Sequence, residues 1–143
     1  MIRNACIDDA KTLQYIENTC FTGDKLSPRA IKYMLRNRQC NTYINVQDGE
    51  AAGYLMTLCH KRSKNARHYS LAVLPDYRNM GIAEALLCHA ESHITSKSGF
   101  KLEIRADNAA ALRLYQRMGY SIIRTIACYY DDNTDAYEMI KTL

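Results

Sequence analysis

Residues 73–84 place an arginine and a glycine where a strand is expected to run into a helix. Arg78 lies in the connecting loop, and Gly81 stands at the start of the helix. The first backbone N–H groups of a helix have no partner within it and lie at the positive end of its dipole. Glycine lets the backbone approach a ligand closely, and arginine adds a charge-assisted donor. The spacing favours an anion site that fits a pyrophosphate, although a purely structural turn has the same pattern.

The elements that must position this loop follow from hydrophobic periodicity and turn residues. Asp48-Gly49 between two strand-like runs predicts a hairpin, and Ser27-Pro28 and Asp107-Asn108 predict helix starts. The strand before Gly81, its helix and the next strand predict a parallel β-α-β crossover. The expected strands are 2–6, 42–46, 52–59, 67–73, 101–106, 120–130 and 136–142, and the expected helices are 10–20, 28–35, 81–98 and 108–118.

The composition is that of one globular domain. The chain has 143 residues, of which 48% are hydrophobic and 24% charged. No apolar run could span a bilayer and no signal peptide is visible, so we expect a cytoplasmic protein. The six cysteines form no CxxC pair, which predicts free, mostly buried thiols and no metal site. The net charge of +4 does not indicate nucleic-acid binding. The basic run at 61–67 is expected to be a solvated loop between strands; the alternative is a rim that attracts an anionic cofactor or an acidic substrate.

Two segments resemble the signatures of a known family. Arg78-Asn79-Met80-Gly81-Ile82-Ala83 resembles the acetyl-CoA signature of GNAT acetyltransferases, Arg/Gln-x-x-Gly-x-Gly/Ala, and follows a strand that ends Val-x-Pro. Residues 102–120 resemble the second signature, in which an asparagine precedes a helix that ends Leu-Tyr-x-x-x-Gly-Phe/Tyr. The resemblance is closest to N-terminal acetyltransferases of the RimI/Ard1 kind. It implies a single-domain GNAT fold over 1–143, of the α/β (α+β) class, with a mixed central sheet of about six to seven strands flanked by four helices.

The resemblance also implies which residues bind acetyl-CoA. The main chain of Leu71, Ala72 and Val73 would hold the pantetheine arm, and the Val73 N–H would stabilise the oxyanion. In this family a bulge usually splays this strand from its parallel neighbour and admits the reactants. Asn108 would contact the cofactor, cap its helix, or do both. The pyrophosphate would be wrapped by the loop and the helix start, with the Glu84 side chain turned away; these residues are Arg78, Asn79, Met80, Gly81, Ile82, Ala83 and Glu84.

Two residues match catalytic positions of the family. Tyr115 matches the general acid, because a phenol near the sulfur can protonate the leaving thiolate, although it could also serve only in packing. Glu103 matches the position proposed as general base in RimI-like enzymes; the alternative is a salt bridge with a neighbour such as Arg105 or Arg124. The implied reaction is direct attack of a deprotonated amine on the acetyl group in a ternary complex. An α-ammonium group, with a pKa of roughly 8, loses its proton to a base more readily than a lysine ammonium, whose pKa is roughly 10.4.

The acceptor is implied only in outline. The resemblance indicates a protein or peptide with a free α-amine, with a ribosomal protein among the candidates, and Phe21, Tyr129 and Tyr130 would line its groove. Phe21-Thr22-Gly23 stands near where the ribosomal-protein enzyme usually has Pro-Trp, which puts that substrate in doubt. The alternatives are an enzyme for lysine side chains or small amines and a non-catalytic acyl-CoA-binding module. We expect a monomer or weak homodimer, with neither nucleic acid nor membrane as partner.

Overall fold

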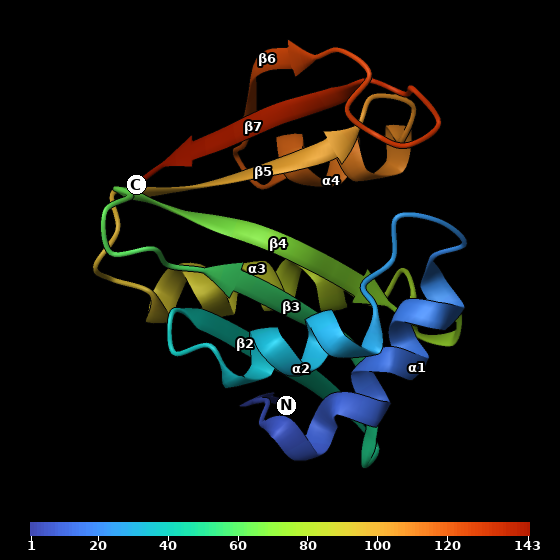
Figure 1. Ribbon diagram of the computed structural model, residues 1–143. Coiled ribbons are helices and arrows are strands. Elements are labelled where there is room, and N and C mark those ends of the chain that lie inside the picture. Colours follow the sequence, from blue (N-terminus) through green and yellow to red (C-terminus); the bar gives the residue numbers. More distant parts are fainter.

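A seven-stranded mixed sheet runs through the computed structural model, which describes residues 1–143 (Figure 1). The strand order is β1-β2-β3-β4-β5-β7-β6, and β4 and β5 are the one parallel pair. The expected fold class and the expected order of strands and helices are therefore confirmed. The strands are β1 (Ile2–Asn4), β2 (Cys40–Gln47), β3 (Glu50–Leu58), β4 (Asn65–Val73), β5 (Gly99–Arg105), β6 (Ser121–Ile126) and β7 (Ala136–Thr142).

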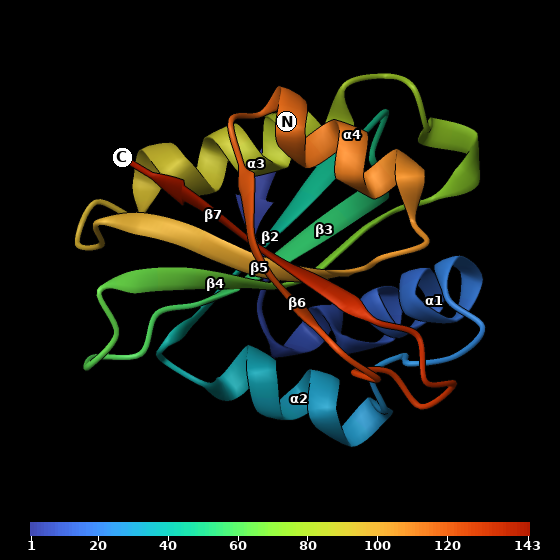
Figure 2. The ribbon, with the colours of Figure 1, turned by 90° about the horizontal axis from the view of Figure 1, so that it is seen from above.

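Two pairs of helices cover opposite faces of the sheet (Figure 2). Helices α1 (Ala10–Cys20) and α2 (Pro28–Arg36) lie on one face, and α3 (Ile82–His93) and α4 (Ala109–Arg117) lie on the other. The apolar core is accordingly divided into two clusters, one on each side of the sheet. None of the four helices combines the length and the apolar character that a membrane-spanning helix needs.

The predicted capping residues occupy the helix ends. The Ser27 side chain accepts a hydrogen bond from the Ala30 N–H at 3.1 Å, and Pro28 begins α2 behind it. A cap of this kind satisfies an N–H that has no partner inside the helix. Gly119 follows α4 with φ of +97°, the left-handed conformation that commonly ends a helix.

Strands β4 and β5 are joined at one end only. Their parallel pairing covers Asn65 to Arg67 and the first three residues of β5, after which the strands diverge (Figure 1). The register between β3 and β4 shifts at the same place, because Met56 pairs with Ser70 while Thr57 pairs with His68. The residue left unpaired is Tyr69, so β4 carries a bulge, and a bulge bends its strand and increases the local twist. The result is a V-shaped gap at the centre of the sheet.

Two expected element ends are wrong. Helix α3 ends at His93, not at 98, because Ile94 is extended and Lys97 donates to the carbonyls of His60 and Ser63 in the β3–β4 loop. Strand β6 ends at Ile126, because the chain turns at Cys128, where φ is +52°.

The expectation of mostly buried thiols is also wrong. All six cysteines are free, but three are exposed and three are half-buried. Composition indicates the redox state of thiols better than it indicates their burial, because a thiol is small enough to fit both in the core and at the surface.

Candidate active site

A groove of about 760 Å³ runs from the V-shaped gap to the start of α3. Strand β4 contributes Leu71, Ala72 and Val73, and α4 contributes Tyr115 and its cap residue Asn108. The remaining predicted cofactor residues in its lining are Arg78, Asn79, Gly81, Ile82, Ala83 and Glu84. Met80 is the exception: its side chain is 58% exposed and does not line the groove.

The main chain of β4 faces the gap at alternate residues. The Leu74 N–H donates to the Ala52 carbonyl at 2.8 Å. In an antiparallel ladder this turns the N–H and C=O of Val73, and of Leu71 two residues earlier, away from β3. In agreement, the Val73 carbonyl accepts a hydrogen bond from Arg78 Nε at 3.1 Å. A row of main-chain donors and acceptors therefore lies along one wall of the gap.

The loop before α3 has the features of an anion site. Gly81 occupies the N-cap position with φ of +75°, and Asn79 also has a positive φ of +62°. A side chain at Gly81 would be strained at this φ. The expectation that the Glu84 side chain turns away is wrong: Glu84 lines the groove, and its Oε2 lies 3.5 Å from where a Cβ of residue 81 would stand. Its Oε1 pairs with Arg117 at 2.6 Å, which offsets the carboxylate charge near the helix start. The backbone N–H groups at the start of α3 thus meet no unpaired acidic group.

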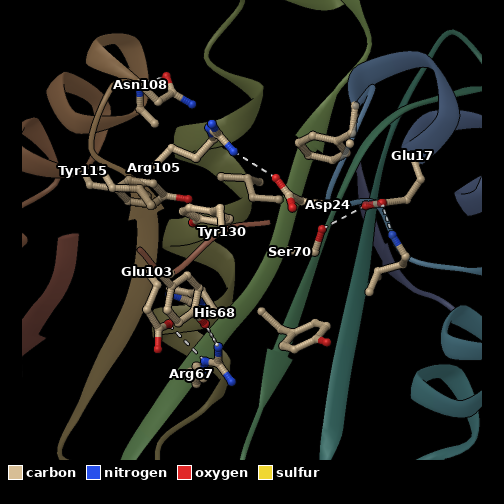
Figure 3. A pocket seen from close by; sticks show the side chains of 18 residues that line it. Glu17, Asp24, Arg67, His68, Ser70, Glu103, Arg105, Asn108, Tyr115 and Tyr130 are labelled. Atoms are coloured by element: carbon tan, nitrogen blue, oxygen red, sulfur yellow. Dashed lines mark hydrogen bonds and ion pairs between the residues drawn. The ribbon is translucent and has the colours of Figure 1, made fainter. Parts of the chain in front are cut away.

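A second cavity, of about 360 Å³, opens from the gap on the side of α1 and α2 (Figure 3). Its lining includes the three predicted acceptor residues, Phe21, Tyr129 and Tyr130, and the predicted base Glu103. We call it the acceptor pocket. The groove and the acceptor pocket share a small set of lining residues: Phe21, Leu71, Asn108, Ala111 and Tyr115. The two cavities therefore meet beside Tyr115.

Tyr115 has the surroundings that a proton donor needs. Its side chain is 7% exposed, and its hydroxyl forms no hydrogen bond within the protein. Burial raises the pKa of this phenol above its ordinary value, because the charged form is poorly solvated. The ring packs edge-on against Tyr120 with centroids 5.6 Å apart. Tyr115 is thus a protonated phenol at the junction of the two cavities, while Asn108 caps α4 by accepting from the Ala111 N–H at 3.1 Å.

Glu103 forms a salt bridge, but not with either of the partners suggested by the sequence. Its Oε2 accepts from Arg67 Nε at 3.0 Å, across from β5 to β4. Arg124 lies on β6, which β7 separates from β5, and it pairs with Glu138 of β7 instead. Arg67 also donates to the Tyr129 hydroxyl at 3.3 Å. Tyr129 and Tyr130 lie in the turn between β6 and β7, not on the strand expected to extend to 130.

Arg105 joins the two loops that flank the acceptor pocket, and the sequence did not reveal this. It pairs with Asp24 of the α1–α2 loop at 2.9 Å (Figure 3). It also pairs with Asp132 of the β6–β7 loop at 2.5 Å. Its guanidinium also lies over the Tyr130 ring, 4.8 Å from the centroid. The Arg105 guanidinium holds the pKa of Asp132 down at about 2. No local pattern could show the link to Asp24, which is 81 positions away in sequence.

Glu17 is a second residue that the sequence did not assign to the site. Glu17 is 1% exposed and lines the acceptor pocket, where its carboxylate accepts from Ser70 Oγ at 3.0 Å and from the Leu26 N–H at 2.8 Å (Figure 3). It also accepts from the Tyr54 hydroxyl. These bonds join α1, β3, β4 and the α1–α2 loop. The available signal was a carboxylate among the apolar positions of a helix, which is costly unless it is fully paired.

His68 forms a buried polar chain on the floor of the acceptor pocket. Its Nδ1 lies 2.9 Å from Thr57 Oγ1, and its Nε2 lies 2.9 Å from the Tyr120 hydroxyl. Tyr120 donates its proton to Glu91, which pairs with Lys141. His68 therefore carries its proton on Nε2 and accepts from Thr57 at Nδ1. Burial lowers the pKa of His68 to about 3, so the ring is neutral at pH 7.

The comparisons with known proteins agree with this geometry. Residues 10–120 match the acetyltransferase (GNAT) family. The chain is 30% identical over 122 residues to an N-alpha-acetyltransferase of Sulfurisphaera tokodaii, covering 76% of this chain and 73% of that protein. It is 29% identical to the N-terminal acetyltransferase A complex catalytic subunit NAA10 of Arabidopsis thaliana, over 99% and 77% of the two chains.

Among solved structures, the fold matches the ribosomal-protein-S18-alanine N-acetyltransferase of Escherichia coli with a TM-score of 0.90 and 25% identity, over 99% of this chain and 92% of that one. The match to the family model spans the anion loop, the V-shaped gap and the helix that carries Tyr115. With the same signatures found in both the sequence and the fold, the chain belongs to the GNAT family of acetyltransferases.

Proposed function

We propose that this protein transfers an acetyl group from acetyl-CoA to the N-terminal α-amine of a protein or peptide. The observation that carries the proposal is the meeting of two cavities in the V-shaped gap beside Tyr115. One cavity has the donors that a pyrophosphate and an extended pantetheine arm require. The other has the carboxylate and aromatic residues that suit an amine on the end of a peptide.

The residues of the groove fit acetyl-CoA. The N–H groups at the start of α3 and the side chain of Arg78 would hold the pyrophosphate. The main-chain N–H and C=O of Leu71, which face the gap, would pair with the pantetheine arm. The Val73 carbonyl already accepts from Arg78, which leaves the Val73 N–H for the acetyl group. When bound, acetyl-CoA would supply the activated acetyl thioester at the junction with the acceptor pocket.

The acceptor pocket would prepare the amine. Glu103 lies within it and keeps its Oε1 outside the bond to Arg67, so this oxygen is available to take a proton from the ammonium directly or through a water. An α-ammonium releases its proton more readily than a lysine does, since its pKa is roughly 8 rather than roughly 10.4. Phe21, Tyr129 and Tyr130 would enclose the first residues of the acceptor.

The transfer then needs two further groups. The neutral amine would form a C–N bond with the acetyl carbon as the C–S bond breaks, and the sulfur would take the proton of the Tyr115 hydroxyl. The new amide nitrogen would release its extra proton to water, and water would return a proton to the Tyr115 phenolate. The raised pKa of Tyr115 keeps that proton in place until the thiolate develops. The Val73 N–H, which faces the gap, would donate to the carbonyl oxygen as charge builds there.

A competition between two peptide pools tests the proposal. One pool has free α-amines and blocked lysines, and the other has the reverse; each is incubated with acetyl-CoA and analysed by mass spectrometry. We expect acetylation of the first pool alone. Acetylation of the second alone, or of neither despite clear binding of acetyl-CoA, would contradict transfer to an N-terminus.

A further inference from the structure

The exposed face of α2 carries an unbalanced positive charge. Arg29, Lys32 and Arg36 are exposed and recur at the spacing that places residues on one side of a helix. Tyr33 stands among them with 67% of its side chain exposed. The buried side of the same helix, with Ile31 and Met34, packs on the sheet. We call the exposed residues Arg29, Lys32, Tyr33 and Arg36 the α2 stripe.

No acidic residue of the chain forms a salt bridge with these cations. Between residues 25 and 47 there are five lysines and arginines and no aspartate or glutamate. The other 14 lysines and arginines of the chain are offset by 15 aspartates and glutamates, so the net positive charge resides in this segment. None of the eight salt bridges of the structure involves a residue of the segment. Elsewhere five arginines form ion pairs with carboxylates, Arg67 and Arg105 among them.

The α2 stripe begins beside the acceptor pocket. Helix α2 follows directly on the α1–α2 loop, whose Phe21, Asp24 and Leu26 line that pocket. From Arg29 to Arg36 the helix rises about 10 Å. An extended peptide covers this length in about three residues. An acceptor whose first residues fill the pocket can therefore present the residues that follow to the stripe.

We propose that the α2 stripe binds acidic residues of the acceptor chain a few positions after its N-terminus, so that the enzyme prefers acceptors with an acidic segment there. The inference rests on the proposed function, since it extends the acceptor pocket along the same peptide. Exposed guanidinium and ammonium groups attract carboxylates weakly one by one, but three on one helix face act together on a single segment. Tyr33 adds a flat, partly apolar surface between them.

Peptides that differ only in their downstream charge test this preference. All share one neutral four-residue N-terminus with a free α-amine, and continue for eight residues as Glu/Ser, Gln/Ser or Lys/Ser repeats. We expect kcat/KM for the acidic peptide to exceed that for the neutral one by about tenfold at low ionic strength, with the basic peptide poorest. In 0.5 M salt, where the Debye length is short, the differences should largely disappear.

A charge-reversal variant locates the effect. The triple variant Arg29→Glu, Lys32→Glu, Arg36→Glu should lose or invert the preference while it keeps its turnover of the neutral peptide. The matched control is Lys61→Glu, Arg62→Glu, Lys64→Glu in the β3–β4 loop, which runs beside the C-terminus (Figure 1). These three cations are exposed and form no salt bridge. This control has the same change in net charge and should keep the preference.

The outcomes separate cleanly. Equal kcat/KM for the three peptides in the wild type, or equal loss of preference in both triple variants, overturns the inference. A further result also overturns it: the stripe binds a 12-nucleotide single-stranded RNA in competition assays, but the charge-reversal variant keeps the wild-type preference among the peptides. If no peptide with a free α-amine is acetylated, the proposed function itself fails, and the neutral peptide reports this independently of the stripe.

Discussion

Arg67 donates its Nε–H to Oε2 of Glu103 over 3.0 Å, and so links the last residue of β4 that pairs with β5 to the residue two places past its partner Lys101. The ion pair has two consequences. It fixes the Glu103 carboxylate toward the acceptor pocket, and it places a cation next to the proposed base. A test of Glu103 must therefore separate proton transfer from the loss of an ion pair.

The substitution Glu103→Gln should lower kcat by about 100-fold or more, since loss of a general base typically costs that much. The Tm rise on adding acetyl-CoA should stay as in the wild type, because the groove does not include Glu103. The control is Glu138→Gln: Glu138 is the register partner of Glu103 on β7, forms an ion pair with Arg124, and lies outside the acceptor pocket. An equal loss of kcat in both variants would assign Glu103 a structural role only.

Tyr115→Phe should reduce kcat by about 100-fold while the KM for acetyl-CoA changes little. The hydroxyl has no hydrogen-bond partner within the protein, so its removal should also leave the Tm unchanged. Steady-state kinetics and a thermal melt of the same preparation check both points. Undiminished turnover would show that Tyr115 serves in packing alone.

Gly81→Glu should abolish the Tm rise that acetyl-CoA gives to the wild type, since it adds a side chain and a negative charge at the anion loop. It should also lower stability by about 1 kcal/mol, because the left-handed backbone strains any L-residue. Gly49→Glu is a matched control, since Gly49 has φ of +81° in the β2–β3 turn with open space around it. That variant should show a similar drop in Tm and keep the full response to acetyl-CoA.

The buried His68 should make the protein sensitive to acid. Its pKa is about 3 in the folded chain and near 6.5 when unfolded. Between these values the unfolded state binds the extra proton, so this contribution to stability is complete above about pH 6.5 and falls as the pH drops, by about 1.4 kcal/mol per pH unit. Urea melts from pH 7 to 4 should show this slope in the wild type and a slope shallower by that amount in His68→Gln. His60→Gln, at an exposed position, should keep the wild-type slope.

Arg105→Gln should raise the KM for peptide acceptors about fivefold, because it releases the α1–α2 loop from the β6–β7 loop at the pocket mouth. The KM for acetyl-CoA should not change, since Arg105 does not line the groove. Arg124→Gln removes an exposed ion pair on β6 and β7 and should change neither the KM for peptide nor the KM for acetyl-CoA. If Arg105→Gln raised only the KM for acetyl-CoA, Arg105 would not act on the acceptor pocket.

The parts of the site that were predictable from sequence depend on local backbone geometry. Gly81 at a positive φ, Ser27 and Asn108 as caps, and the strand before the anion loop all follow from neighbours within a few positions. The same signals gave the order of all strands and helices. The placement of Met80 was missed because one loop residue can turn to solvent while its neighbours line a groove.

The parts that could not be predicted depend on contacts between distant residues. Glu103 meets Arg67 across 36 positions, and the choice between Arg67, Arg105 and Arg124 depends on the strand order β5-β7-β6. The chain through His68 joins β3, β4, α3 and Tyr120, the residue before β6, and no periodicity in the sequence indicates it. Such pairings exist only once the sheet has formed.

Only three residue pairs connect the half-sheet β1–β4 to the half-sheet β5–β7. Past that short seam, the amides of Leu71 and Val73 have no neighbouring strand. In hydrogen-exchange experiments on the free protein, these amides should therefore exchange much faster than those of Leu55 or Tyr54 in the middle of β3, although all four belong to one continuous sheet. The centre of this sheet, ordinarily its best protected region, is then the place where solvent reaches the backbone first.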